Sequence, residues 1–194
     1  MHDHSHGDSS SAEVFTFTDR GSKLILSAPH ATRSFENHHE KVADVYTGAL
    51  VQLLGENNNI STIIRTKFVP HRTSVADYIA DHKLEDHYFL DIHGFNQPID
   101  YDICLGIGHF QAQDYPYLSA ILSLAAGYNL RCIVNHPNYK GLYGLTGSYQ
   151  QRWHQPNVIQ IELQPYLRDF YHHPDTVLTT TIPFFNDVIQ LYES

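Results

Sequence analysis

Residues 24–30, LILSAPH, form an apolar run that is stopped by Pro29 and ends on His30. Residues 87–94, HYFLDIHG, repeat this pattern and end on His93, where Gly94 allows a tight exit. Short apolar runs bounded by proline or glycine are typical of buried strands. Each of these two strands therefore carries a histidine at the point where it leaves its sheet.

Further apolar runs alternate with helical stretches along the chain. The expected strands cover residues 13–18, 23–27, 60–65, 87–92, 101–107, 130–134 and 158–163, the first two paired as a hairpin that turns at residues 19–21. The expected helices cover residues 40–54, 115–128 and roughly the last 20 residues around Pro183. Asn37 and Glu40 resemble a capping box for the first helix, and Gly55 suits its end. This alternation predicts an α/β fold, a single-domain three-layer sandwich with a mixed, mostly parallel central sheet flanked by helices.

Length and composition indicate one compact domain. A chain of 194 residues, 42% apolar and 17% charged, is long enough for one sizeable core. Residues 1–12 are rich in Ser, Asp and His without periodicity, so we expect a disordered His-rich tail before a single domain over residues 13–194. His2, His4 and His6 could hold a metal only loosely in such a tail.

Charge and hydropathy narrow the partners and the location. The formal charge of −9, with no cluster among twelve Lys and Arg, disfavours nucleic acid. No apolar run approaches the ~20 residues that span a bilayer, and the N-terminus lacks the apolar core of a secretory signal. We therefore expect no membrane partner and a cytoplasmic location. Cys104 and Cys132 lie in apolar runs, which predicts buried free thiols.

Three groups that can carry chemistry fall at the ends of predicted strands. In open α/β sheets, ligands bind beyond the carboxyl ends of the strands, so His30 and His93 can converge there if their strands are neighbours. Glu162 lies within VIQIELQ, an apolar strand whose flanking residues should be buried. Burying an unpaired carboxylate costs several kcal/mol, so Glu162 is expected to have a partner or a task.

Two imidazoles and an acid at one sheet edge suit a hydrolytic zinc site. Such a site uses His and carboxylate ligands and leaves one position open for water. The metal lowers the pKa of that water and polarises the scissile carbonyl, while a separate carboxylate takes the proton. His30 and His93 suit the ligand roles, and Glu162 suits the base. Asp91, two residues before His93, could orient a histidine or a water.

The third ligand is open on spacing alone. The candidates are the carboxylates that follow His30, namely Glu36, Glu40 and Asp44. Glu40 has a competing role as the partner of Asn37 in the capping box. Asp44 lies off the apolar stripe of the predicted helix, where a solvated residue is also expected.

Four ordered segments resemble a known family. They are SAPHATRS, KVADVYTG, DIHGF followed by DICLGIG, and VIQIELQPYLR, and they extend from about residue 24 to residue 168. This set is similar to the motifs of the N-formylglutamate amidohydrolase-like family, whose fold is similar to that of zinc carboxypeptidases and zinc amidases. The resemblance implies a zinc-hydrolase-like domain with Zn²⁺, or another divalent metal, as its cofactor.

The resemblance also assigns roles to residues. It implies His30 and His93 as metal ligands and Glu162 as the catalytic acid and base. The acidic residue before a Thr-Gly pair in the family falls on Asp44, which favours Asp44 as the third ligand.

Arginines for a substrate carboxylate are less directly placed. Arg72 in VPHRTS and Arg152 in YQQRWH are the candidates, because a guanidinium binds a carboxylate in a bidentate manner. The chain departs from the family here, since Val69-Pro70-His71-Arg72 stands where the family has Asp-x-Asn-Arg, and the chain is also shorter.

Together these observations predict a metal-dependent amidohydrolase that cleaves an amide bond of a small N-acyl amino acid, such as an N-formylglutamate-like substrate. The partner is then a small-molecule amide that carries a carboxylate; the oligomeric state is not predicted. One alternative is a zinc peptidase or cell-wall-type amidase, for which we expect an open groove. Another is a non-catalytic protein that stores or senses metal through its histidines.

Overall fold

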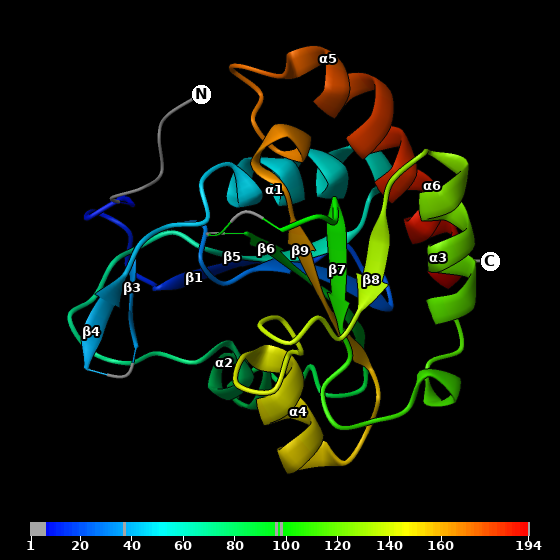
Figure 1. Ribbon diagram of the computed structural model, residues 1–194. Helices are drawn as coiled ribbons and strands as arrows, with labels where there is room; N and C mark the ends of the chain where they lie inside the picture. The colour runs from blue at the N-terminus through cyan, green and yellow to red at the C-terminus, as the bar shows by residue number, and fades with distance from the viewer. Residues whose placement is uncertain (1–6, 37, 96, 98, 194) are drawn as a thin grey trace.

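The computed structural model describes residues 7–36, 38–95, 97 and 99–193 (Figure 1). A seven-stranded sheet in the order β1-β5-β2-β6-β9-β7-β8 forms its centre. Its strands are β1 Phe15–Thr18, β2 Leu24–Ala28, β5 Ser61–Arg65, β6 Tyr88–Gly94, β7 Ile103–Gly106, β8 Cys132–Val134 and β9 Val158–Leu163. The helical elements are α1 Thr47–Asn58, α2 Val75–Asp81, η1 Ala112–Asp114, α3 Leu118–Gly127, α4 Leu145–Trp153, η2 Pro165–Leu167, α5 Pro174–Thr176, η3 Val177–Thr181 and α6 Ile182–Glu193.

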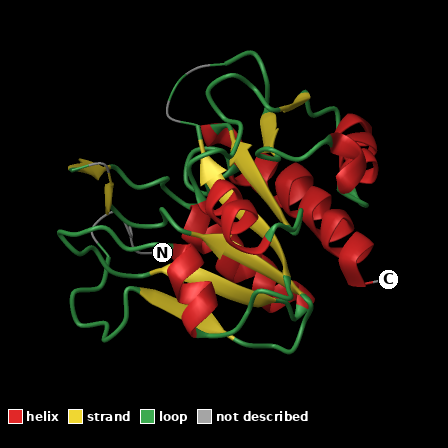
Figure 2. Ribbon diagram, turned by 90° about the horizontal axis from the view of Figure 1, so that it is seen from below, coloured by secondary structure: helices red, strands yellow, loops and turns green. Residues whose placement is uncertain are grey.

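Helices cover both faces of the sheet. In Figure 1, α2 and α4 lie below the sheet, α1 lies above it, and α6 runs along its right side next to α3. Each face has its own apolar core: Leu50, Ile121 and Val188 belong to the cluster under α1, α3 and α6, and Ile79 and Tyr149 belong to the cluster under α2 and α4. Figure 2 shows the twist of the sheet between these helices. The predicted three-layer α/β fold is confirmed.

Four neighbouring strands, β5, β2, β6 and β9, run parallel. Strand β1 is antiparallel to β5 at one edge, and β7 is antiparallel to β9, so the sheet is mixed as predicted. All residues of β2 and β9 are buried, as their continuous apolar runs indicate. The carboxyl ends of β2, β6 and β9 therefore meet along one edge.

The predicted hairpin between the first two strands is wrong. Strand β5 lies between β1 and β2 and pairs with both. The turn itself exists, with the Gly21 N–H donating to the Asp19 side chain, but the Arg20 N–H donates to Ser61 Oγ at the start of β5. The local sequence indicates the turn, whereas the long-range pairing decides the partner strand.

The first helix also differs from its prediction. It begins at Thr47 and ends at Asn58, and the residues before it form a hairpin of β3 (Ser34–Glu36) and β4 (His39–Lys41). Glu40 lies in β4, so it caps no helix, and Asn37 lies outside the described residues.

Gly55 lies inside α1 and does not end it. A Cβ at Gly55 would lie 2.4 Å from the Thr62 side chain, so glycine is needed where the helix crosses β5. The helix ends at Asn58, and the cap residue Asn59 has a left-handed backbone whose N–H donates to the Gly55 carbonyl.

The described end of the segment expected to be a tail, residues 7–12, is held against the sheet. Gly7 bridges Lys67, and the Asp8 N–H donates to the Thr66 carbonyl at 2.7 Å. His2, His4 and His6 lie outside the described residues.

Both cysteines are free thiols, with Cys104 buried and Cys132 half-buried. Within the described part of the chain, no helix is long and apolar enough to cross a membrane.

Candidate active site

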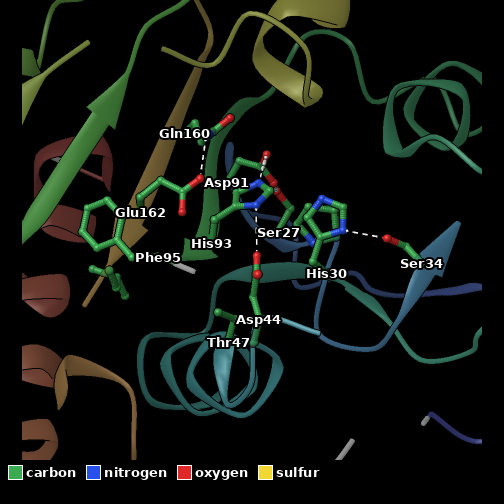
Figure 3. Close-up of polar contacts among 12 residues, drawn as sticks. Ser27, His30, Ser34, Asp44, Thr47, Asp91, His93, Phe95, Gln160 and Glu162 are labelled. Atoms are coloured by element: carbon green, nitrogen blue, oxygen red, sulfur yellow. Dashed lines mark hydrogen bonds and ion pairs between the residues drawn. The ribbon is translucent and has the colours of Figure 1, made fainter. Parts of the chain in front are cut away.

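His30, His93 and Glu162 meet at the shared edge of the three central strands. His30 follows the end of β2, and His93 on β6 lies directly across from Glu162 on β9 in the register of the two strands. The ring centroids of His30 and His93 are 5.0 Å apart. Figure 3 shows Glu162 and Asp44 on two sides of the His93 ring. The sheet therefore brings together the residues that the sequence singles out.

His93 lies between two carboxylates. Its Nδ1 is 3.3 Å from Asp44 Oδ2, and its Nε2 is 2.8 Å from Asp91 Oδ2. Burial by itself lowers the pKa of His93, but the two carboxylates outweigh burial and raise this pKa to about 10. Asp91 is fully buried and accepts a hydrogen bond from Ser27 Oγ at 2.5 Å. A chain of contacts from β2 thus orients the His93 ring.

Asp44 is positioned by the turn that leads into α1. Its N–H donates to the His30 carbonyl at 2.8 Å, and its own carbonyl accepts from Thr47 Oγ1 at 2.7 Å. Tyr46 adopts a left-handed conformation, φ 70°, as the chain enters the helix. Burial raises the pKa of Asp44, but its hydrogen bond with His93 and the nearby charges of Lys41 and the two histidines together outweigh burial and hold this pKa well below its ordinary value.

Of the other two candidate ligands, Glu36 lies beside His30 in the pocket, whereas Glu40 lies outside it. Glu36 Oε1 is 3.3 Å from His30 Nε2, and Ser34 Oγ is 3.1 Å from His30 Nδ1. Glu40 is exposed and pairs with Arg33. Burial, with further contributions from Lys41, lowers the pKa of His30 well below its ordinary value, so this imidazole is neutral and able to ligate.

Glu162 is buried on the floor of the site. Burial raises the pKa of its carboxyl, and the opposing charge of His93 only partly offsets this effect. Gln160 Nε2 donates to Glu162 Oε1 at 2.8 Å. Sequence reasoning missed Gln160, although the period of two along a strand places residues 160 and 162 on the same face.

The donor set suits a divalent metal, although the side chains now pair with one another. In the described part of the chain, no three His, Cys, Asp or Glu side chains are arranged to hold a metal ion. His30, Asp44 and His93 nevertheless place two imidazoles and a carboxylate next to one another, and these are donors that zinc accepts. The contact between His93 and Asp91 is the kind of outer hydrogen bond that orients a metal-ligating imidazole. Metal binding would require Asp44 and His93 to exchange their direct contact for the ion.

A pocket of about 540 Å³ opens over these residues. His30, His93, Gln160 and Glu162 line its floor. Its cationic lining residues are Lys41, Arg65, Arg72 and Lys140. Of the two arginines predicted to bind substrate, Arg72 lines the pocket and Arg152 does not. Arg152 on α4 donates instead to the Ala76 carbonyl and to Asp77 at 2.6 Å.

Arg65 is a pocket residue that sequence reasoning missed. Arg65 is only 2% exposed. Its Nε donates to the Pro29 carbonyl at 2.7 Å, and its Nη2 donates to Thr73 Oγ1 at 2.8 Å. Its Nη1 is buried and has no hydrogen-bond partner among the described residues. Burial lowers the pKa of Arg65 to about 10, so the group stays charged at neutral pH. The available signal was an arginine at the end of an apolar strand, where burial of a charge is costly.

Comparison with known proteins supports the fold. No protein-family model matches the sequence, and neither does any curated protein sequence. A bacteriophage poly-gamma-glutamate hydrolase matches with a TM-score of 0.61 at 13% identity, over 95% of this chain and 90% of that chain. The N-formylglutamate amidohydrolase from Ralstonia eutropha JMP134 matches with a TM-score of 0.58 at 13% identity, over 92% of this chain and 98% of that chain. The chain shares the fold of these hydrolases.

A third match is the zinc-free apo form of YNDL, with a TM-score of 0.51 at 12% identity, over 95% of this chain and 91% of that chain. At identities this low, the likeness establishes the fold and leaves the activity to be argued from the site. The fold implied by the motif resemblance is therefore confirmed.

Proposed function

We propose that this chain is a metal-dependent amidohydrolase that cleaves an amide bond of a small N-acyl amino acid, such as an N-formylglutamate-like substrate. The observation that carries the proposal is the buried carboxylate of Glu162 directly across from His93, on the floor of a pocket with cationic walls. Hydrolases of N-formylglutamate and of poly-gamma-glutamate share the fold, which supports amide hydrolysis as the reaction.

His30, Asp44 and His93 would hold the metal. When bound, a divalent metal supplies a Lewis acid that acidifies a water molecule and polarises the scissile carbonyl. Asp91 fixes the His93 ring through its 2.8 Å contact, and Ser27 fixes Asp91 in turn. These contacts keep the ring in one orientation, which lowers the cost of assembling the ligand set.

Glu162 would act as the general base and then as the general acid. It takes a proton from the attacking water and returns that proton to the leaving amine. Burial brings the pKa of Glu162 closer to neutral pH, and a group with such a pKa can both accept a proton and return it. Gln160 holds Oε1 of Glu162, so the orientation of the carboxylate is set before substrate binds.

The two pocket arginines suit the anionic parts of the reaction. Arg65 is a buried cation that lines the pocket, and we assign it to the oxygen of the scissile carbonyl, where charge develops. Arg72 is exposed at the pocket wall and suits a substrate carboxylate, which a guanidinium binds in a bidentate manner.

The test combines metal analysis with turnover in a protein that lacks residues 1–6, so that the tail histidines contribute no metal. We expect Glu162→Gln to retain metal and to lose at least ~10²-fold in kcat on N-formyl or N-acetyl glutamate, the scale of a missing general base. His30→Ala and His93→Ala should lose the metal itself. An absence of metal in the unsubstituted protein would refute the proposal. Retained metal without any turnover, and no effect of Glu162→Gln, would favour the non-catalytic alternative.

A further inference from the structure

The loop of residues 137–144 forms one wall of the pocket and presents two side chains that the proposed chemistry does not use. Both Lys140 and Tyr143 line the pocket and are exposed, and Tyr143 is 94% exposed. An aromatic ring left almost fully in water, in the same pocket-lining loop as an exposed cation, is a surface available to a ligand.

The backbone of this loop is held firmly against β7. The Gly108 N–H donates to the Lys140 carbonyl at 2.7 Å, and Cys104 Sγ donates to the Tyr139 carbonyl. Gly106 permits this approach, because a Cβ there would lie 2.8 Å from the Gly141 nitrogen. The loop thus offers its side chains from a fixed support, which reduces the entropy lost on binding.

The pocket is a cationic region in an acidic protein. It is lined by four Lys and Arg residues and by two Glu residues, Glu36 and Glu162, whereas the whole chain has a formal charge of −9. Lys41, Arg72 and Lys140 form no ion pair with any other described residue. Unpaired cations concentrated in a cleft attract anionic ligands.

One N-acyl amino acid does not account for this lining. Arg65 and Arg72 suffice for the scissile carbonyl and one carboxylate, and Lys41 acts on the charges of His30, Asp44 and Glu162, which leaves Lys140 without a task. A pocket of about 540 Å³ lies within the range of roughly 300–1,000 Å³ that accommodates drug-sized ligands, which are larger than a single amino-acid derivative.

We propose that Lys140 and Tyr143 form a second substrate subsite, which binds a further acidic residue of an extended substrate, so that the preferred substrate is an acidic N-acyl peptide. This inference rests on the proposed function of the same pocket. The Lys140 ammonium would pair with the added carboxylate, and the Tyr143 ring would pack against the peptide plane next to it.

The experiment measures binding without turnover. Isothermal titration calorimetry on the metal-loaded Glu162→Gln protein compares N-acetylglutamate, N-acetyl-triglutamate and N-acetyl-triglutamine at low salt. We expect triglutamate to bind more tightly than either of the other two ligands. Lys140→Met should weaken triglutamate binding about fivefold, the upper end for an exposed ion pair, and leave N-acetylglutamate binding unchanged. Tyr143→Ser should also act on the trimers alone.

Lys23→Met is the matched control, because it removes the same charge from an exposed residue just before β2, at the opposite end of the strand from His30. It should change neither affinity. The subsite is refuted if triglutamate gains nothing over N-acetylglutamate, if triglutamine binds as tightly, if Lys140→Met weakens both acidic ligands equally, or if no ligand binds. The proposed function fails separately, when the unsubstituted metal-loaded protein hydrolyses none of these amides.

Discussion

A methyl group at Gly94 should disturb the support of the whole site. Gly94 ends β6 next to His93, and a Cβ there would lie 2.4 Å from Cζ and 2.5 Å from Nε and Nη2 of Arg168. These atoms belong to a flexible side chain, but Arg168 is buried and its guanidinium donates to three carbonyl groups, those of Val45, Phe95 and Leu163. Gly94→Ala therefore displaces a buried cation from its hydrogen-bond partners.

The three carbonyl groups that Arg168 binds lie next to residues of the candidate site. Val45 follows Asp44, Leu163 follows Glu162, and Phe95 lies just after the His93–Gly94 pair. One guanidinium thus ties together the three segments that carry the carboxylates and the histidine.

The expected cost can be assembled from two parts. Overpacking a well-packed interior costs about 1–3 kcal/mol, and the loss of one hydrogen bond from a charged donor costs about 1.5–3 kcal/mol. The contacts to Phe95 and Leu163 are long, at 3.4 and 3.5 Å, so we count only the contact to Val45. We expect Gly94→Ala to lower the free energy of unfolding by about 3–6 kcal/mol.

Urea unfolding monitored by circular dichroism measures this change, with the slope m expected to stay constant. Gly127→Ala is the control, because a Cβ at Gly127, the last residue of α3, would meet no atom within 4 Å. That substitution should stabilise the protein by about 0.4–1 kcal/mol.

A double-mutant cycle tests the cause. Arg168→Leu removes the atoms that the new methyl group would meet, so adding Gly94→Ala to it should cost almost nothing more. The reasoning is refuted if Gly94→Ala is as harmless as Gly127→Ala, or if the effects of the two substitutions simply add.

Three further outcomes follow from particular contacts. Asp102→Asn should destabilise the protein by about 1–2 kcal/mol, a value reduced because the guanidinium of its partner Arg131 is largely exposed. Burial raises the pKa of Asp102, but the hydrogen bonds from Arg131 outweigh burial and hold this pKa below its ordinary value. The difference in urea stability between wild type and Asp102→Asn should therefore be full above about pH 4, and it should shrink as the pH falls through the pKa of Asp102 in the folded protein. Burial raises the pKa of the Cys104 thiol to about 11, so a colorimetric thiol reagent at pH 8 should label it far more slowly in the folded protein than in urea, and equal rates would contradict its burial. Arg72→Gln should raise KM for a carboxylate-bearing amide about tenfold or more. Arg152→Gln is the control, because Arg152 lies outside the pocket, and it should leave KM within about twofold of the wild-type value. A larger increase in KM for Arg152→Gln than for Arg72→Gln would exclude Arg72 as the residue that binds the substrate carboxylate.

Much of the central sheet and the positions of the candidate site residues follow from local sequence. The strand predicted over residues 158–163 matches β9, and that predicted over 60–65 differs from β5 by one residue. Continuous apolar runs are informative because a strand covered on both faces needs apolar side chains at every position. His30, His93 and Glu162 stood out for the same reason, since a polar group next to such a run must be paired or used.

Strand pairing and the contacts around the site were decided by the tertiary structure alone. The insertion of β5 between β1 and β2, the β3–β4 hairpin in place of a helix, and the buried role of Arg65 depend on contacts between residues far apart in the chain. Periodicity describes which face of a segment is apolar, but it carries no information about which segment covers that face. The sequence by itself therefore determined which side chains end the buried strands, and the packing of the sheet determined that Asp44 lies against His93 while Glu40 lies in solvent.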